Sequence, residues 1–181
     1  DSGRVLRIRH QRVMYFMRLN SALNGLTIEE IRRGIESLET IRGRFKMIET
    51  DKFLVVDDCY NANPVSMMAS IDVLFQAKGR KIAVLGDMGE LGSEEKKLHG
   101  MVGTHFAGKK IDALFVTGTL AGEIAEEARR VAPETRVYAE PDKEALEEAL
   151  LEYRRPGDTI LVKASHFMGF SEIVKKLEQP Q

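Results

Sequence analysis

The chain has 181 residues, 43% of them hydrophobic and 30% charged, a size that favours one main domain with an appendage over two equal domains. Its 27 basic side chains nearly cancel its 28 acidic ones, so no overall field favours a nucleic acid or an anionic membrane surface as a partner. A single cysteine, Cys59, excludes an internal disulfide and no apolar run approaches the ~18 residues of a membrane span, so we expect a soluble cytoplasmic protein without membrane insertion.

The chain begins with a helical pattern. Residues 13–23 mix apolar and polar positions at helical spacing, and T-I-E-E at 27–30 has the form of a capping box that begins a helix from about Ile28 to Leu38. The segment Asp1–His10 lacks the apolar core of a signal peptide, so we interpret it as the end of a trimmed domain rather than a targeting signal.

Beyond Gly43 the period becomes that of strands. Residues 44–48 alternate and residues 53–56 form a short apolar run, which predicts a β pair turned at 50–52. Helices and strands then alternate to the end of the chain, with helices from Pro64, after Ser93, and at 120–131, 142–153 and 171–177, and strands at 81–85, 113–116, 136–138 and 159–162. This alternation predicts an α/β fold with a doubly wound, mostly parallel, Rossmann-like sheet, preceded by the short helical segment.

Ligands of such sheets bind at the carboxyl ends of the strands. The loops at those ends are 57–63, 86–92, 117–119 and 163–168. In the first loop, Asn63 and Pro64 suit the N-cap and first position of a helix, which is ordinary helix-start chemistry. That interpretation does not account for the two carboxylates, the phenol and the amide of Asp57, Asp58, Tyr60 and Asn61, a set that suits ribose hydroxyls, an ammonium group or a metal.

The other loops add further polar groups. Three glycines in G-D-M-G-E-L-G at 86–92 allow a close backbone approach to a ligand, although a plain loop explains them equally well; Asp87 and Glu90 there can receive a substrate ammonium. The loop from Lys163 to Met168 brings a cation, a hydroxyl and an imidazole to the same edge. A lone Lys or His is more often a solvated loop residue, but the coincidence with the acidic loops favours a site.

Several residues are not nominated for chemistry. His99 and His105 have no Cys or His partners at metal spacing and are predicted to be surface or core residues, and Cys59 has no evident activating partner. The chain contains neither G-x-x-x-x-G-K-[ST] nor G-x-G-x-x-G, so an ATP site must be completed elsewhere.

Four ordered segments carry a family resemblance: G-R-F at 43–45, D-C-Y-N-A-N-P at 58–64, L-G-D-M-G-E-L-G at 85–92 and L-V-K-A-S at 161–165. They resemble the G-R, D-x-Y-N-A-N-P, L-G-D-M-x-E-L-G and L-V-K-G-S motifs of the MurF branch of the Mur ligase family. The match runs from about Leu26 to Leu177 and departs from the family pattern at Ala164, where Gly is expected, and at His166, where Arg is expected.

The resemblance implies an ATP-dependent ligase that adds D-alanyl-D-alanine to UDP-N-acetylmuramoyl-tripeptide in peptidoglycan synthesis, and so serves cell-wall formation, cell shape and cell division. It implies that residues 1–40 are a helical remnant of a central ATPase domain and that 41–181 are the C-terminal Rossmann-like domain. The absent N-terminal and central domains would bind the substrate nucleotide, the ATP phosphates and Mg²⁺, so the fragment alone would be inactive and contain no catalytic residue.

The same resemblance implies roles for particular residues. Contacts to ATP would come from Arg44, which reaches the phosphates, from Asp58, which accepts from ribose hydroxyls, and from Tyr60 and Asn61 beside them. The substrate side would be lined by Asn63, Asp87, Lys163, Ser165 and His166.

Two alternatives come from other classes of protein. A receiver-like signalling module also has an acidic pair after its first strand and a lysine after its fifth, but the end of the third core strand here, F-V-T-G at 115–118, lacks the aspartate that would be phosphorylated. A non-catalytic nucleotide-binding or protein-interaction domain is compatible with the missing P-loop.

Overall fold

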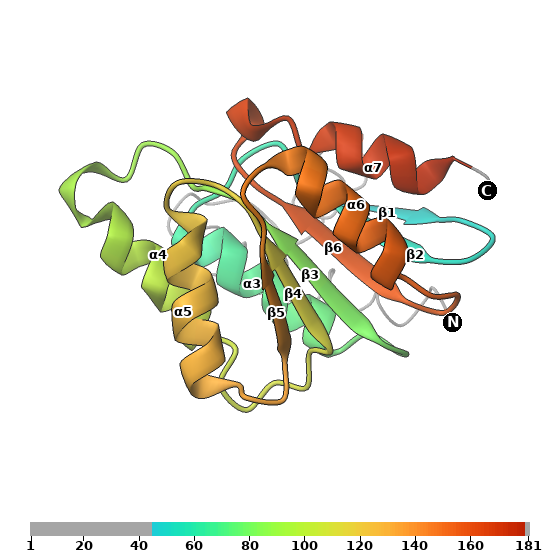
Figure 1. Ribbon diagram of the computed structural model, residues 1–181, viewed down its shortest axis with the longest axis horizontal. Coiled ribbons are helices and arrows are strands. Elements are labelled where there is room, and N and C mark those ends of the chain that lie inside the picture. Colours follow the sequence, from blue (N-terminus) through green and yellow to red (C-terminus); the bar gives the residue numbers. More distant parts are fainter. Residues whose placement is uncertain (1–44, 180–181) are drawn as a thin grey trace, which may run out of the picture. The chain divides into compact units, whose positions relative to one another are not determined.

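The computed structural model describes residues 45–179 (Figure 1). The helices predicted in the N-terminal segment, the domain limit at residues 40 and 41 and the predicted site residue Arg44 lie outside the described residues. Among the helices of this part of the chain, none is long and apolar enough to cross a membrane.

A six-stranded sheet forms the centre of residues 45–179, with the strand order β1-β2-β6-β3-β4-β5. The strands are β1 (Lys46–Glu49), β2 (Leu54–Asp57), β3 (Lys81–Leu85), β4 (Ala113–Val116), β5 (Arg136–Ala139) and β6 (Thr159–Lys163). In this sheet β1 pairs antiparallel with β2, and the other neighbouring strands are parallel. The predicted α/β fold with a mostly parallel sheet is confirmed, as is the antiparallel pair at its start.

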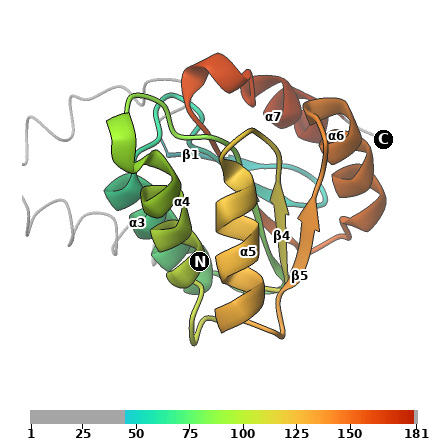
Figure 2. The same cartoon turned by 60° about the vertical axis from the view of Figure 1, so that its left-hand side comes forward.

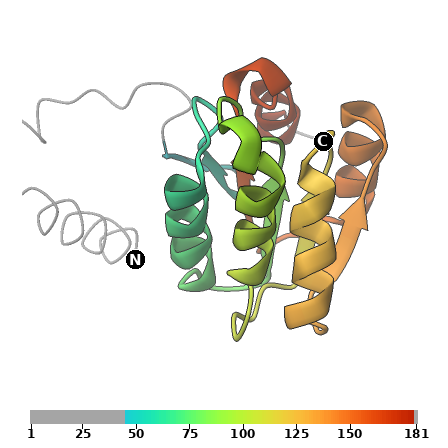
Figure 3. The ribbon, with the colours of Figure 1, turned by 90° about the vertical axis from the view of Figure 1, so that its left-hand side faces the viewer.

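Helices cover both faces of the sheet (Figures 1 and 2). They are α3 (Pro64–Phe75), α4 (Glu95–Thr104), α5 (Ala121–Val131), α6 (Lys143–Tyr153) and α7 (Ser171–Glu178). Figure 3 shows α3, α4 and α5 side by side. Helices α6 and α7 pack on the opposite face of the sheet. Short 3-10 turns at Gly92–Glu94 and His166–Met168 precede α4 and α7.

The strands contribute to two cores because side chains alternate along a strand. In β3, Ala83 and Leu85 pack with α3, α4 and α5, whereas Ile82 and Val84 pack with α6 and α7. Burial on both faces explains why the parallel strands read as continuous apolar runs rather than alternating ones.

Local sequence signals set the starts of two helices, of which the sequence analysis predicts the one at α3. The Asn63 side chain accepts from the Ser66 backbone N–H, the Ser66 hydroxyl accepts from the Asn63 N–H, and Pro64 occupies the first turn of α3. Asp142 caps α6 by accepting from the Ala145 N–H at 2.8 Å. The helix-start interpretation of Asn63 and Pro64 is therefore confirmed.

Candidate functional site

The predicted loops meet at the carboxyl edge of the sheet because β2, β6, β3 and β4 are consecutive neighbours in it. Backbone hydrogen bonds join the loops directly: the Asp58 N–H donates to the Val162 carbonyl, and the Ser165 N–H donates to the Asp87 carbonyl, both at 3.0 Å. The structure thus brings together polar groups that are more than a hundred residues apart in sequence.

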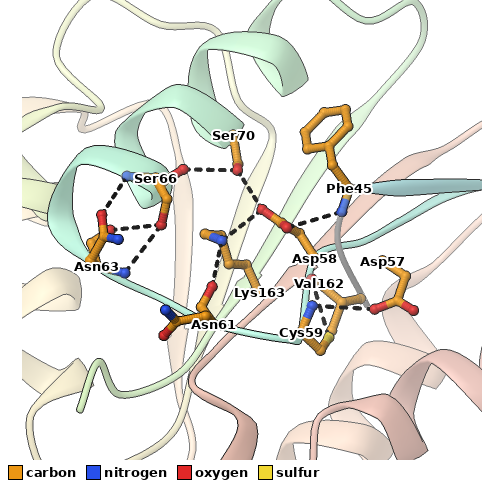
Figure 4. Close-up of polar contacts among 10 residues, drawn as sticks. All are labelled: Phe45, Asp57, Asp58, Cys59, Asn61, Asn63, Ser66, Ser70, Val162 and Lys163. Atoms are coloured by element: carbon orange, nitrogen blue, oxygen red, sulfur yellow. Dashed lines mark hydrogen bonds and ion pairs between the residues drawn. The ribbon is translucent and has the colours of Figure 1, made fainter. Parts of the chain in front are cut away.

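At the centre of this edge is an ion pair between Asp58 and Lys163 (Figure 4). The Lys163 ammonium donates to Asp58 Oδ2 at 2.6 Å and to the Asn61 carbonyl at 2.9 Å. The Asp58 carboxylate also accepts from the Ser70 hydroxyl at 2.8 Å and from the Phe45 N–H at 3.0 Å. The Lys163 side chain is 1% exposed and that of Asp58 is 14% exposed. Asp58 and Lys163 were expected to contact different ligands, whereas in the structure each is the partner of the other.

The neighbouring carboxylate, Asp57, points to the other face. Consecutive residues leaving a strand project to opposite sides, so Asp58 meets Ser70 of α3 while Asp57 lines a pocket beside α7. Asp57 Oδ1 accepts from the Cys59 N–H at 3.2 Å. The predicted acidic cluster is therefore divided between the two faces. Lining this pocket are Lys46, Asp57, Cys59, Tyr60, His166, Ser171, Val174, Lys175 and Glu178.

Cys59 is buried at this edge, and its thiol donates to the Val162 carbonyl at 3.3 Å. Burial raises the pKa of the Cys59 thiol well above its ordinary value, and the neighbouring Asp57 carboxylate raises it further. Since the thiolate is the reactive form, Cys59 is suited to packing and not to nucleophilic chemistry.

Exposed side chains from the first and last loops lie at the rim. Tyr60 is 43% exposed, and its ring lies edge-on to the exposed His166 ring with 6.3 Å between centroids. Asn61 is also exposed and contributes its carbonyl to Lys163. Tyr60, Asn61 and His166 therefore have the accessibility that a ligand contact requires.

Asp87 is held by backbone groups at the start of α5. Its carboxylate accepts from the N–H groups of Thr119, Leu120 and Ala121 at 2.8, 3.0 and 2.7 Å, and the residue is 7% exposed. Gly118 has φ 134°, and an added Cβ there would overlap the Asp87 carboxylate. In this geometry the Asp87 carboxylate binds the backbone N–H groups at the start of α5 and stabilises that helix start. The geometry therefore does not support the predicted role of Asp87 as the acceptor of a substrate ammonium.

Two further hydrogen bonds hold the Gly86–Gly92 loop. The Gly89 N–H donates to the buried Ser165 hydroxyl at 2.8 Å, and the Met88 N–H donates to His99 Nε2 of α4 at 2.9 Å. His99, predicted to be a surface or core residue, lies in the core. The signal that identifies it is its helical spacing with the buried residues Val102 and Gly103.

Ala164, where the family pattern has Gly, lies against Gly86 and Phe170. Ala164 is fully buried, and an added Cβ on Gly86 would lie 2.9 Å from the Ala164 Cβ and 2.8 Å from the Phe170 ring. Gly86 therefore leaves the space that the Ala164 methyl group and the Phe170 ring occupy.

Within residues 45–179, no group of three or more His, Cys, Asp or Glu side chains is arranged to hold a metal ion.

Comparisons with known proteins agree with this architecture. Residues 43–166 match the family model of the Mur ligase, glutamate ligase domain. The chain is 38% identical over 156 residues to the UDP-N-acetylmuramoyl-tripeptide–D-alanyl-D-alanine ligase of Bacillus subtilis, covering 84% of this chain and 34% of that one. It is 30% identical to the Escherichia coli enzyme of the same name, covering 86% of this chain and 34% of that one.

Solved structures give the same result. The MurF ligase of Thermotoga maritima in complex with ADP superimposes with a TM-score of 0.67 and 29% identity, covering 88% of this chain and 35% of that one. A MurF structure from Acinetobacter baumannii gives a TM-score of 0.69 with the same identity and coverage. The chain thus spans about a third of the length of these relatives (34% of the curated ones). The match to the family model and the place of three motif segments at one edge of the sheet lead to the same conclusion. The chain belongs to the Mur ligase family and carries that family's C-terminal domain.

Proposed function

We propose that this chain is the C-terminal domain of an ATP-dependent ligase that joins D-alanyl-D-alanine to UDP-N-acetylmuramoyl-tripeptide in peptidoglycan synthesis. The observation that carries the proposal is the Asp58–Lys163 pair, which ties two of the family's motif segments together at the carboxyl edge. The relatives of the same name in Bacillus subtilis and Escherichia coli support the substrate assignment.

The proposed reaction needs activation followed by positioning. The carboxylate of the tripeptide takes the γ-phosphoryl group of ATP to give an acyl phosphate and ADP, and the dipeptide amine then attacks the acyl carbon and displaces inorganic phosphate while losing a proton. A carboxylate is a poor acyl donor until its oxygen becomes a phosphate leaving group. Holding the amine in line with the acyl carbon contributes several kcal/mol, roughly 7–11 in the most favourable cases. Closure of a domain that carries this edge is one way to hold the amine in that position.

We assign roles to the residues of this edge by whether their side chains are exposed or buried. Tyr60, Asn61 and His166 are exposed at the rim and are proposed to contact the nucleotide and the dipeptide. Lys163 and Ser165 are buried, and we propose that they set the shape of the edge from within, with the charge of Lys163 balanced by that of Asp58. The ADP in the Thermotoga maritima relative supports ATP as the energy source.

The phosphates and Mg²⁺ are proposed to be held mainly by a central domain. This chain has no G-x-x-x-x-G-K-[ST] sequence, which is the motif that cradles phosphates and presents a hydroxyl to magnesium. The groups that fit the nucleotide here are the Tyr60 ring and the Asn61 amide, which suit a base or a ribose better than a triphosphate.

Phosphate release by the full-length ligase that contains this chain tests the proposal. Release should require ATP, the tripeptide nucleotide and D-alanyl-D-alanine together, and a mass spectrum should show the joined product. Phosphate release without the dipeptide, or with no joined product, contradicts the proposed substrates. The 181-residue chain alone is expected to release no phosphate, and release by the pure chain with contaminating ATPases excluded would contradict the assignment of the phosphates to another domain.

A matched pair of variants tests the site. Tyr60→Ala should raise the apparent KM for ATP about tenfold, equivalent to roughly 1.4 kcal/mol. Phe75→Ala removes an aromatic ring of similar exposure, 38% against 43%, from the other end of α3. It should leave both substrate constants unchanged. If Tyr60→Ala and Phe75→Ala change the apparent KM for ATP equally, Tyr60 does not mark the nucleotide site.

A further inference from the structure

The imidazole of His99 bridges α4 and the Gly86–Gly92 loop while fully buried, at 0% exposure. Its Nδ1 lies 2.7 Å from the Glu95 carbonyl oxygen and its Nε2 lies 2.9 Å from the Met88 backbone nitrogen. A carbonyl oxygen only accepts and a backbone N–H only donates. Both contacts are satisfied only by a neutral ring that carries its proton on Nδ1.

The partner of this ring is itself buried. Met88 is 2% exposed, so without Nε2 its N–H would be left unpaired away from water. The adjacent backbone groups bond in the opposite direction, toward the end of β6: the Gly86 N–H donates to the Lys163 carbonyl and the Gly89 N–H donates to the Ser165 hydroxyl. His99 is thus the anchor from α4 for a loop that is also held by β6, by the loop after β6 and, through Asp87, by the start of α5.

Glu90, two residues after Met88, has an unusual backbone conformation. Glu90 has φ 60°, a left-handed conformation that few residues other than glycine adopt. Non-glycine residues stay in this region where the surrounding structure over-determines them, often at functional sites. Glu90 is also exposed, so the loop presents a carboxylate to solvent directly after two pinned residues.

We infer that His99 is a positioning residue: its neutral, Nδ1-protonated imidazole accepts from the Met88 N–H and thereby fixes the Gly86–Gly92 loop, with Glu90 presented at its tip. The inference deepens the proposed function, on which its consequence for ligation rests. His99 has no access to substrate because it is fully buried. Its effect on the reaction therefore passes through the loop.

The first test uses the unmodified chain and needs no activity. A ¹⁵N-edited spectrum of the His99 ring at neutral pH should show the proton on Nδ1, a tautomer that free histidine disfavours, and amide exchange of Met88 should be slow. A ring protonated on Nε2, a charged ring, or a fast-exchanging Met88 amide would overturn the inference whatever the protein's reaction is.

The second test compares two variants that mimic different ring nitrogens. In His99→Gln, the longer side chain places an oxygen near the position of Nε2, where it can accept from Met88. In His99→Asn, the shorter side chain keeps a donor for Glu95 but does not reach the loop. Under conditions where circular dichroism shows both variants folded, His99→Asn should lose protection at Met88 and Gly89, and His99→Gln should retain it.

In the full-length ligase, kcat/KM for the dipeptide should fall about tenfold or more in His99→Asn and return to within about threefold of the unmodified value in His99→Gln. His105→Asn and His105→Gln are the controls, since His105 caps the same helix but pairs with Asp72 at 2.8 Å. Equal losses in both His99 variants would mean a packing role and overturn the inference. If the full-length protein forms no joined product, the proposed function fails, and the ring tautomer and Met88 exchange still decide the role of His99.

Discussion

The Asp58 carboxylate and the Lys163 ammonium group form a 2.6 Å ion pair across a separation of 105 residues. The pair joins the loop after β2 to the last residue of β6, two neighbouring parallel strands. Because Lys163 is almost fully buried, removing either charge leaves the other without its partner in a region that excludes water.

Lys163→Met should therefore be strongly destabilising, by about 3–5 kcal/mol in urea unfolding of the chain. Asp58→Asn should also destabilise it, and the double variant should cost clearly less than the two single changes added together. The Glu94–Lys97 pair, which is exposed on α4 and the turn before it, is the control: Lys97→Met should have no measurable effect. If the losses of unfolding free energy from the substitutions at Asp58 and Lys163 simply add up in the double variant, the pairing is contradicted.

The effects of substitutions at Asp87 and Gly118 on the free energy of unfolding should also be non-additive. Asp87→Ala removes the acceptor for three backbone N–H groups at the start of α5 and should cost about 1–3 kcal/mol. Gly118→Ala should be destabilising because the methyl group overlaps the Asp87 carboxylate and because φ is 134°. In the Asp87→Ala background the overlap disappears, so the second change should cost less there. Gly122→Ala, whose added Cβ meets no atom within 4 Å, should be neutral or stabilising.

Two glycines on α4 should respond to alanine with opposite signs. An added Cβ on Gly103 overlaps the Ile124 carbonyl oxygen of α5, so Gly103→Ala should push the helices apart and cost about 1–3 kcal/mol. At Gly100 the nearest atom is the flexible Glu127 Cγ at 3.5 Å, so Gly100→Ala should stabilise α4 by up to about 1 kcal/mol. Thermal unfolding of the two variants measures the difference, and destabilisation of equal size would rule out close α4–α5 packing as its cause.

Cys59 should be unreactive while the chain is folded. Its pKa is raised by burial, so little thiolate exists at neutral pH, and raising the pH to 9 should hardly increase the rate of alkylation. In concentrated urea the thiol should titrate near its ordinary value of about 8.5 and react quickly. Rapid alkylation of the native chain at pH 7, followed by mass spectrometry, would contradict this burial.

The edge at which the site would form was predictable from the sequence. The 3.6-residue period predicts the helices of residues 45–179, and one alternating segment and several short apolar runs predict its strands. The N-caps Asn63 and Asp142 set helix starts through contacts within three residues. Since parallel strands share a carboxyl edge, the polar loops that follow them were expected there.

Which side chains meet at that edge was decided by the tertiary structure. The insertion of β6 between β2 and β3 places Lys163 beside Asp58, and no local period encodes strand order. The turn of Asp87 toward α5 and the reach of His99 to Met88 likewise depend on how helices pack on the sheet. Composition identifies the charged and polar groups of such a site, but their partners are set by contacts between segments far apart in sequence, because only folding makes those segments neighbours.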